Sequence, residues 1–105
     1  MAGRKVTVFA LVKAKPGLEE AVKKELSALV GPTRTEEGCI NYDPHQSLDQ
    51  KGHFRLYENW TSKELLDRHL QSAHVKRFIA KADHLLAEPP EITLWEMLPA
   101  DTGIG

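Results

Sequence analysis

Two kinds of hydrophobic periodicity divide the chain into strands and helices. Alternating or continuous apolar runs of about eight residues, bounded by turn residues, predict strands, whereas apolar residues three or four positions apart predict helices. The expected strands are residues 5–14, 39–47, 53–60 and 91–98. The expected helices are residues 18–30, 61–70 and 73–87, with one further turn at 33–37. The order is strand, helix, strand, strand, helix, strand, with the second helical segment broken near residue 71.

Proline and capping residues suggest where these elements begin and end. Pro32 is expected to kink or break the first helix, because proline removes a backbone donor and clashes with the preceding turn. Pro44 makes the second strand less certain, because proline cannot donate to a sheet ladder. Thr61 and Glu64 fit a capping box at the start of the second helix, and Ser72 fits a cap for the third.

The apolar faces of these elements indicate how they pack. Both faces of the first strand are largely apolar, with Val8 and Val12 on one and Phe9 and Leu11 on the other. An antiparallel sheet with one face in water would show one polar face, so both faces should be covered. On the third strand, Phe54, Leu56, Glu58 and Trp60 share one face, and Arg55, Tyr57 and Asn59 share the other. The last helix should bury Val75, Phe78, Ile79, Ala82, Leu85 and Leu86.

The element order is that of the split βαβ, or ferredoxin-like, α+β fold, βαββαβ. It predicts a four-stranded antiparallel sheet with helices on one face. The second apolar face could pack against the same face of another copy across a two-fold axis, giving a dimeric α/β barrel. We therefore expect one domain over residues 1–105, with its core at 5–98, a mobile tail at 99–105 and a homodimeric assembly.

Composition excludes several classes of function. The 105 residues carry a net charge of −1, with acidic and basic groups interspersed, so we expect no nucleic-acid partner. No apolar run approaches the roughly 18 residues of a membrane span, so we expect no membrane association. The single cysteine, Cys39, allows no internal disulfide. Together with the lack of a signal-peptide pattern, it suggests a cytoplasmic protein.

The densest group of chemically useful side chains lies in residues 57–74. His69 and His74 flank the helix break, and histidine is the side chain best suited to exchange protons near neutral pH. Each also has a structural interpretation: His69 can cap the end of its helix, and His74 can tie two helices together. Asn59 could hydrogen-bond a ligand or the turn backbone, and Tyr42 could place its hydroxyl in a pocket or find a structural partner.

The remaining aromatic residues and histidines are weaker candidates. Trp60 and Trp95 are expected to be core or interface residues first, and Phe9 and Phe78 to be packing residues that could also line a pocket. His45, His53 and His84 are expected at the surface. We expect no metal site, because a zinc site needs three or four converging ligands and His69 and His74 have no evident carboxylate partner in the sequence.

Four segments give the chain a resemblance to the antibiotic biosynthesis monooxygenase (ABM) family of the dimeric α/β-barrel superfamily. The matching pieces run from Lys5 to Leu98, although each is weakly specific alone. They are Lys15-Pro16-Gly17 after the first strand, Glu36-Glu37-Gly38-Cys39-Ile40-Asn41-Tyr42, Phe54-Arg55-Leu56-Tyr57-Glu58-Asn59-Trp60, and Leu66-Asp67-Arg68-His69-Leu70-Gln71-Ser72-Ala73-His74-Val75.

The resemblance implies a homodimer with a pocket between sheet and helices in each subunit. It also implies oxidation of a quinol- or anthrone-like aromatic by dioxygen without a cofactor, which needs a general base, a hydrogen-bond donor for the oxyanion and an apolar cavity. On this basis the catalytic candidates are His69, Asn59 and His74. The substrate-binding candidates are Tyr57, Trp60, Tyr42, Phe9, Phe78 and Arg55.

Two other functions stay open. Relatives that degrade haem have characteristic residues where this chain has Ala10, His69 and Ile79, which argues against haem. Another relative isomerises a phosphorylated signalling compound, so an isomerase or lyase acting on a small hydroxycarbonyl is an alternative. A phosphate would need a basic anchor, for which Arg55, Lys76 and Arg77 are available. The third possibility is a dimer that binds ligands or assembles without catalysis.

Overall fold

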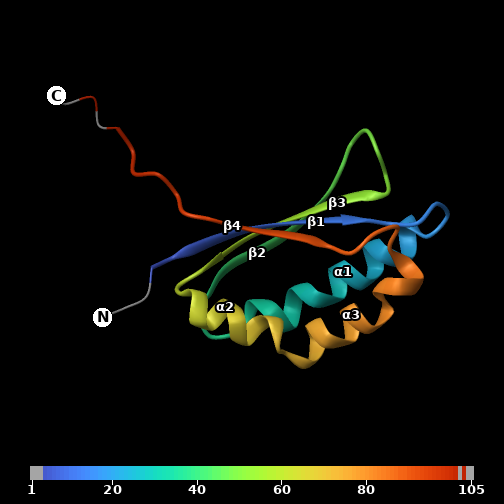
Figure 1. Ribbon diagram of the computed structural model, residues 1–105, viewed down its shortest axis with the longest axis horizontal. Coiled ribbons are helices and arrows are strands. Elements are labelled where there is room, and N and C mark those ends of the chain that lie inside the picture. Colours follow the sequence, from blue (N-terminus) through green and yellow to red (C-terminus); the bar gives the residue numbers. More distant parts are fainter. Residues whose placement is uncertain (1–3, 102, 104–105) are drawn as a thin grey trace.

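The computed structural model describes residues 4–101 and 103. Its elements, in chain order, are β1 (Val6–Lys13), α1 (Glu19–Arg34), β2 (Cys39–Gln46), β3 (His53–Trp60), α2 (Lys63–Leu70), α3 (Ala73–Leu85) and β4 (Glu91–Trp95). The strands form one antiparallel sheet in the order β2-β3-β1-β4, and Figure 1 shows all three helices on one side of it. The ferredoxin-like prediction is thereby confirmed.

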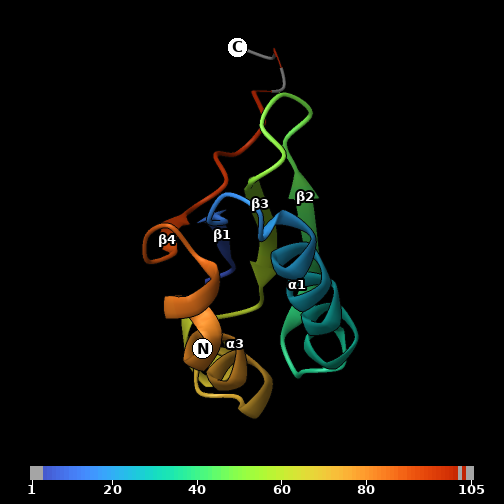
Figure 2. The same ribbon diagram turned by 90° about the vertical axis from the view of Figure 1, so that its right-hand side faces the viewer.

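The helix-covered face of the sheet holds the core. Val8, Leu56 and Trp60 point from the central strands toward the helices and are at most 4% exposed. The helices α1 and α3 run alongside each other beneath the sheet, as Figure 2 shows end-on, and an ion pair of 3.0 Å joins Lys81 to Glu25 between them. Within the described part of the chain, no helix has the length and apolarity needed to cross a membrane.

Proline disturbs the fold less than the sequence suggested. The helix α1 continues through Pro32 to Arg34, so the expected break at that position is wrong. Pro32 removes one backbone donor from the last turn of α1, and the fully buried Thr33 holds that turn against the core. Pro44 sits within β2, which is an edge strand, and an edge strand can leave a missing donor on its open side.

Three further expectations need correction. The cap of α2 is Ser62, whose hydroxyl accepts from the Leu65 amide at 3.2 Å, so the Thr61–Glu64 capping box does not form. Ile79 is 50% exposed and does not belong to the buried stripe of α3. The last strand ends at Trp95, three residues earlier than expected. The tail expected at 99–105 falls partly outside the described residues, because positions 102, 104 and 105 are not among them.

The face of the sheet away from the helices carries several exposed aromatic and apolar side chains. Phe9 stacks on Tyr57 with ring centroids 5.4 Å apart and meets Trp95 edge-on at 6.3 Å. Trp95 and Met97 are 56% and 63% exposed. This open face, formed mainly by Phe9, Tyr57, Trp95 and Met97, has the composition that the predicted dimer interface requires.

Candidate functional site

Local hydrogen bonds fix the two histidines at the junction of α2 and α3. His69 lies in the last turn of α2 and His74 in the first turn of α3. Between them, the Ser72 hydroxyl donates to the His69 carbonyl at 2.6 Å and accepts from the Val75 amide at 3.4 Å, so it caps α3 and holds the end of α2. The predicted helix break and the Ser72 cap are both confirmed.

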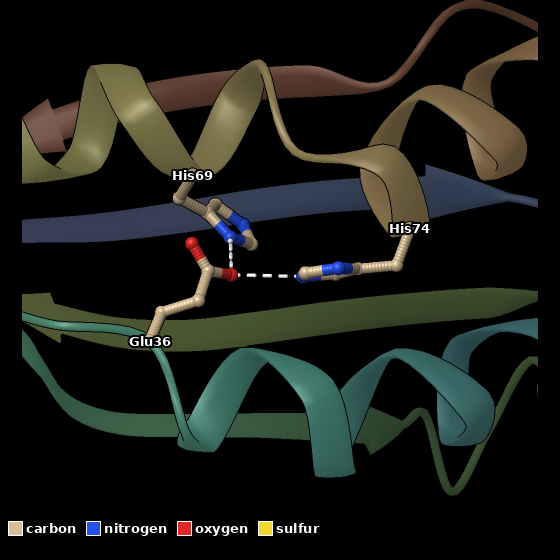
Figure 3. Close-up of side chains that lie close together, drawn as sticks. All are labelled: Glu36, His69 and His74. Atoms are coloured by element: carbon tan, nitrogen blue, oxygen red, sulfur yellow. Dashed lines mark hydrogen bonds and ion pairs between the residues drawn. The ribbon is translucent and has the colours of Figure 1, made fainter.

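Glu36 joins the two histidines, as Figure 3 shows. Its Oε2 atom lies 2.7 Å from His69 Nδ1 and 2.8 Å from His74 Nε2. A carboxylate can only accept hydrogen bonds, so each of these two ring nitrogens carries a hydrogen and donates the hydrogen bond. A neutral His69 therefore carries its hydrogen on Nδ1 and leaves Nε2 with a free lone pair.

The turn between α1 and β2 aims Glu36 at the histidines. The Glu36 amide donates to the Thr33 carbonyl at 3.0 Å, and the Glu36 carbonyl accepts from the Cys39 amide at 3.2 Å. Gly38 takes a φ of 87°, a left-handed conformation that favours glycine, and its carbonyl accepts from the Thr61 amide at 2.9 Å. The turn is therefore fixed by hydrogen bonds within it and by a hydrogen bond from Thr61.

Burial favours the neutral form of His69, which packs among aromatic rings. The residue is 2% exposed, its ring lies 4.7 Å from that of Trp60, and Tyr42 meets it edge-on at 5.5 Å. Burial lowers the pKa of His69, with the Glu36 carboxylate opposing the shift and His74 adding to it. The ring is thus suited to accept a proton at neutral pH.

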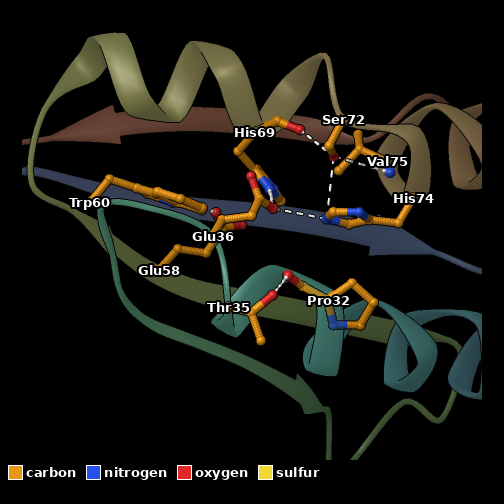
Figure 4. Close-up of polar contacts among 9 residues, drawn as sticks. All are labelled: Pro32, Thr35, Glu36, Glu58, Trp60, His69, Ser72, His74 and Val75. Atoms are coloured by element: carbon orange, nitrogen blue, oxygen red, sulfur yellow. Dashed lines mark hydrogen bonds and ion pairs between the residues drawn. The ribbon is translucent and has the colours of Figure 1, made fainter.

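Glu58 is a buried carboxyl on the same side of the sheet, as Figure 4 shows. It is 4% exposed and accepts a hydrogen bond of 2.9 Å from Trp60 Nε1. Burial raises the pKa of Glu58 to about 7, Glu36 adds to the rise and the Trp60 bond opposes it. A large share of this carboxyl therefore keeps its proton at neutral pH and can donate a hydrogen bond.

A cavity of about 50 Å³ lies beside these groups, between the sheet and the helices. Its polar lining is His69, Glu58 and Tyr42, and the rest is apolar. Burial raises the pKa of Tyr42, so its hydroxyl stays protonated. The half-exposed Ile79 of α3 and Ile92 of β4 lie at its outer edge. The cavity has room for a few water molecules and is well below the roughly 300 Å³ of a typical ligand site.

The sheet divides the predicted site residues into two groups. His69, Tyr42 and Phe78 line the cavity, Trp60 packs behind His69, and His74 joins them through Glu36. The others lie on the open face: Phe9, Arg55, Tyr57 and Asn59. The expectation that Asn59 and Tyr57 share a pocket with His69 is therefore wrong, because alternate residues of β3 point to opposite faces.

Asn59 has a structural role on the open face. Its side-chain oxygen accepts a hydrogen bond from the Thr7 hydroxyl, and its amide nitrogen donates to Asn41 Oδ1 at 2.9 Å. These bonds link β3 to both of its neighbours, β1 and β2. Arg55 lies beside Phe9 and Trp95 in a hollow of about 390 Å³ on the same face.

Sequence reasoning missed two acidic residues of the site. The sequence pattern could have indicated Glu58, because it is the one charged residue in the apolar face of the third strand. Glu36 gave no such signal, because it lies in a turn 33 residues before His69 and no spacing rule connects them. Glu36, His69 and His74 each present one ligand atom, and these atoms lie within 4.8 Å of one another. The reason for expecting no metal site, the lack of a carboxylate partner, is thus wrong.

Comparison with known proteins places the chain among relatives of the same fold. The model of the family described as "Antibiotic biosynthesis monooxygenase" matches residues 5–81. The chain is 35% identical over 89 residues to "Putative monooxygenase Rv0793" of Mycobacterium tuberculosis, covering 85% of this chain and 87% of that protein. It is 29% identical over 97 residues to "Uncharacterized protein sll1783" of Synechocystis sp., covering 92% of this chain but only 66% of that protein.

A solved structure agrees with this assignment. The crystal structure of PA3566 from Pseudomonas aeruginosa superposes with a TM-score of 0.88 at 34% identity, covering 94% of this chain and 99% of that one. At this identity and coverage, the two chains share the fold described above.

Proposed function

The chain belongs to the antibiotic biosynthesis monooxygenase family, and from that premise we propose that it is a cofactor-independent monooxygenase acting on a quinol- or anthrone-like aromatic. The observation that carries the proposal is the 2.7 Å hydrogen bond between Glu36 and His69 beside the cavity. It holds the imidazole in the tautomer whose Nε2 is free to take a proton, and stabilises the imidazolium that results.

The proposed reaction needs only the substrate, dioxygen and these side chains. His69 Nε2 removes a proton from the enol or phenol form of the substrate, leaving an electron-rich anion. The anion passes one electron to dioxygen, and the resulting radical and superoxide combine to form a C–O bond. For an anthrone-like CH₂ group, the peroxide then loses water: one oxygen atom remains as a carbonyl, and the other leaves with the two hydrogens.

Glu58 and Tyr42 supply the hydrogen-bond donors in this scheme. The Glu58 carboxyl and the Tyr42 hydroxyl both line the cavity that His69 borders. A buried carboxyl that stays protonated can donate to an oxyanion as charge develops on it, which lowers the barrier to deprotonation. Trp60 Nε1 holds one oxygen of Glu58 and so fixes its orientation.

The cavity must enlarge to admit an aromatic substrate. Its outer edge is formed by Ile79 and Ile92, which are 50% and 44% exposed, so separation of α3 from β4 would widen it without breaking the core. We infer that substrate enters at this edge, where apolar side chains meet solvent.

We also infer a homodimer formed through the open face. Phe9, Tyr57, Trp95 and Met97 give this face an apolar surface that pairing would cover. Light scattering at micromolar concentration should give twice the mass of the 11.8 kDa chain. A mass of one chain would contradict the inference.

Oxygen uptake tests the proposed reaction. Metal-stripped, flavin-free protein is mixed with reduced naphthoquinols and anthrones, and uptake is compared with autoxidation alone. Native protein should accelerate uptake, and His69→Ala should lose most of the acceleration. The matched control is His84→Ala, which removes an exposed histidine of α3 and should behave as native. Uptake at the autoxidation rate for every compound would contradict the proposal.

The small cavity favours a second candidate, an isomerase of a small hydroxycarbonyl. Proton transfer between neighbouring carbons needs a base and an acid, and His69 and Glu58 border the same cavity. Arg55 lies on the opposite face of the sheet from the cavity. A phosphate anchor would therefore have to come from the exposed Lys76 or Arg77 of α3. Solvent deuterium incorporation into a small hydroxyketone, lost in His69→Ala, would support this candidate, and no incorporation would exclude it for that compound.

A further inference from the structure

We propose that Glu36, His69 and His74 form a binding site for a divalent transition-metal ion, and that the bound ion blocks His69 as a base. This site goes beyond the proposed function, because it uses Nδ1 of His69, whereas the proposed base is Nε2. Each residue offers one ligand atom, and the three atoms lie within 4.8 Å of one another. Figure 3 shows both imidazole rings directed at the same carboxylate oxygen.

The donor set fits ions of the Zn²⁺ class. Two imidazole nitrogens and one carboxylate oxygen are ligands that zinc takes in proteins, at about 2.0–2.2 Å, with water in the remaining position. The two nitrogens now sit at hydrogen-bond distances of 2.7 and 2.8 Å from Glu36 Oε2. An ion would take the place of the two N–H hydrogens, with small rotations of side chains that already converge.

The backbone holds these side chains close together before any ion is bound. The Ser72 hydroxyl bonds to the His69 carbonyl at 2.6 Å, and it lies 3.3 Å from His74 Nε2. The turn of Glu36 is closed by its own backbone bonds to Thr33 and Cys39. The three ligand side chains are therefore largely ordered before an ion binds, which reduces the entropic cost of binding.

Solvent reaches the site from one side. The side chains of Glu36 and His74 are 18% and 15% exposed, whereas that of His69 is 3% exposed. An ion can approach past Glu36 and His74 and keep a water ligand there. The single negative charge of Glu36 would offset part of the charge of the ion in this partly buried setting.

Binding of the ion and proton transfer exclude each other. An ion on Nδ1 of His69 requires a lone pair at that atom, so the ring hydrogen must move to Nε2. Nε2 is the atom that acts as the base in the proposed reaction. It then carries a hydrogen and cannot take a proton from a substrate, while Glu36 is occupied as a ligand.

Calorimetric titration of the chelator-treated chain with Zn²⁺ tests this site. Native protein should bind one ion per chain. Glu36→Gln and His74→Gln should each weaken binding by more than about tenfold, because each removes a ligand. The controls His45→Gln and His84→Gln remove exposed histidines outside the cluster and should leave the affinity within about twofold.

The titration has a clear contrary result and does not depend on catalysis. Circular dichroism confirms the fold of each variant, and His74→Gln, whose side chain is partly exposed, covers the case in which Glu36→Gln misfolds. No saturable one-to-one binding would overturn the proposal, as would binding that neither ligand substitution weakens. Binding is measured without substrate, so an inactive protein that binds zinc refutes only the proposed function.

Discussion

The two faces of the sheet differ in the groups they hold and in what holds them. The helix-covered face has a small cavity with a histidine, a carboxyl and a phenol, all at most 4% exposed. The open face has larger hollows, of about 390 and 240 Å³, but the buried Asn59 on that face is bonded to its strand neighbours. Buried ionisable groups gathered around one cavity mark the chemical face, and the volume of a hollow does not.

The largest expected effect is on the chemistry of the covered face. Glu36→Gln should lower the rate of the enzymatic reaction by about 10²–10⁴-fold, because an amide can donate to His69 Nδ1 and favour the wrong tautomer. Steady-state kinetics on the substrate that responds best in the oxygen-uptake panel measures it. Glu37→Gln is the matched control, since Glu37 is exposed and its carboxylate forms a surface ion pair with Arg68 at 3.7 Å. Equal rates in the two variants would remove Glu36 from the mechanism.

The turn that carries Glu36 should be the most sensitive backbone position. Gly38→Ala places a methyl group 2.5 Å from Leu65 Cδ1 at a φ of 87°, and should lower the free energy of unfolding by about 2–4 kcal/mol. Gly17→Ala is the control, because Gly17 has a similar φ of 88° but nothing within 4 Å of the added carbon. It should cost only about 1 kcal/mol of strain. Urea denaturation compares the two, and equal losses would show that the turn is not tightly packed.

Burial of Glu58 should make stability depend on pH. The folded-state pKa of Glu58 is about 7 against an ordinary 4.5, so the folded protein binds this proton more tightly than the unfolded chain. The contribution of Glu58 is therefore full below pH 4.5 and is lost as the pH rises through 7. The loss is on the order of 3 kcal/mol.

Glu58→Gln isolates this contribution from those of its neighbours. The ionisable groups near Glu58 include Glu36, Cys39, Tyr42 and His69, and all four remain in the variant. Urea denaturation between pH 4.5 and 8 should show a difference between native and Glu58→Gln that changes with pH in the stated direction. A constant difference would mean that Glu58 titrates at an ordinary pKa.

The smallest expected effect on the free energy of unfolding comes from a substitution on the open face. Trp95→Asp should leave the free energy of unfolding of a single chain within about 1 kcal/mol, because Trp95 is 56% exposed. It should nevertheless convert the inferred dimer to a monomer in light scattering, since two charges would meet across the two-fold axis. A dimer that survives the substitution would place the interface elsewhere.

The sequence predicted the fold well because local patterns determine it. Alternation on β1 and β3 and the three- and four-residue spacing of the helices identify the elements without reference to distant residues. The same alternation already assigned Asn59 and Glu58 to opposite faces, so a stricter use of it would have separated the two groups of site residues. Glu36 could not be found in this way, because its contact with His69 depends on how the α1–β2 turn packs beneath α2.

The tautomer of His69 is the most direct test of the account. In chelator-treated protein at neutral pH, ¹⁵N–¹H correlation spectra of the histidine side chains should show His69 with hydrogen on Nδ1 and a bare Nε2. The Glu36→Gln spectrum, recorded alongside, identifies the signals that depend on this contact. Hydrogen on Nε2, or on both nitrogens, would contradict the account, because His69 could not then accept a proton from a substrate in the cavity.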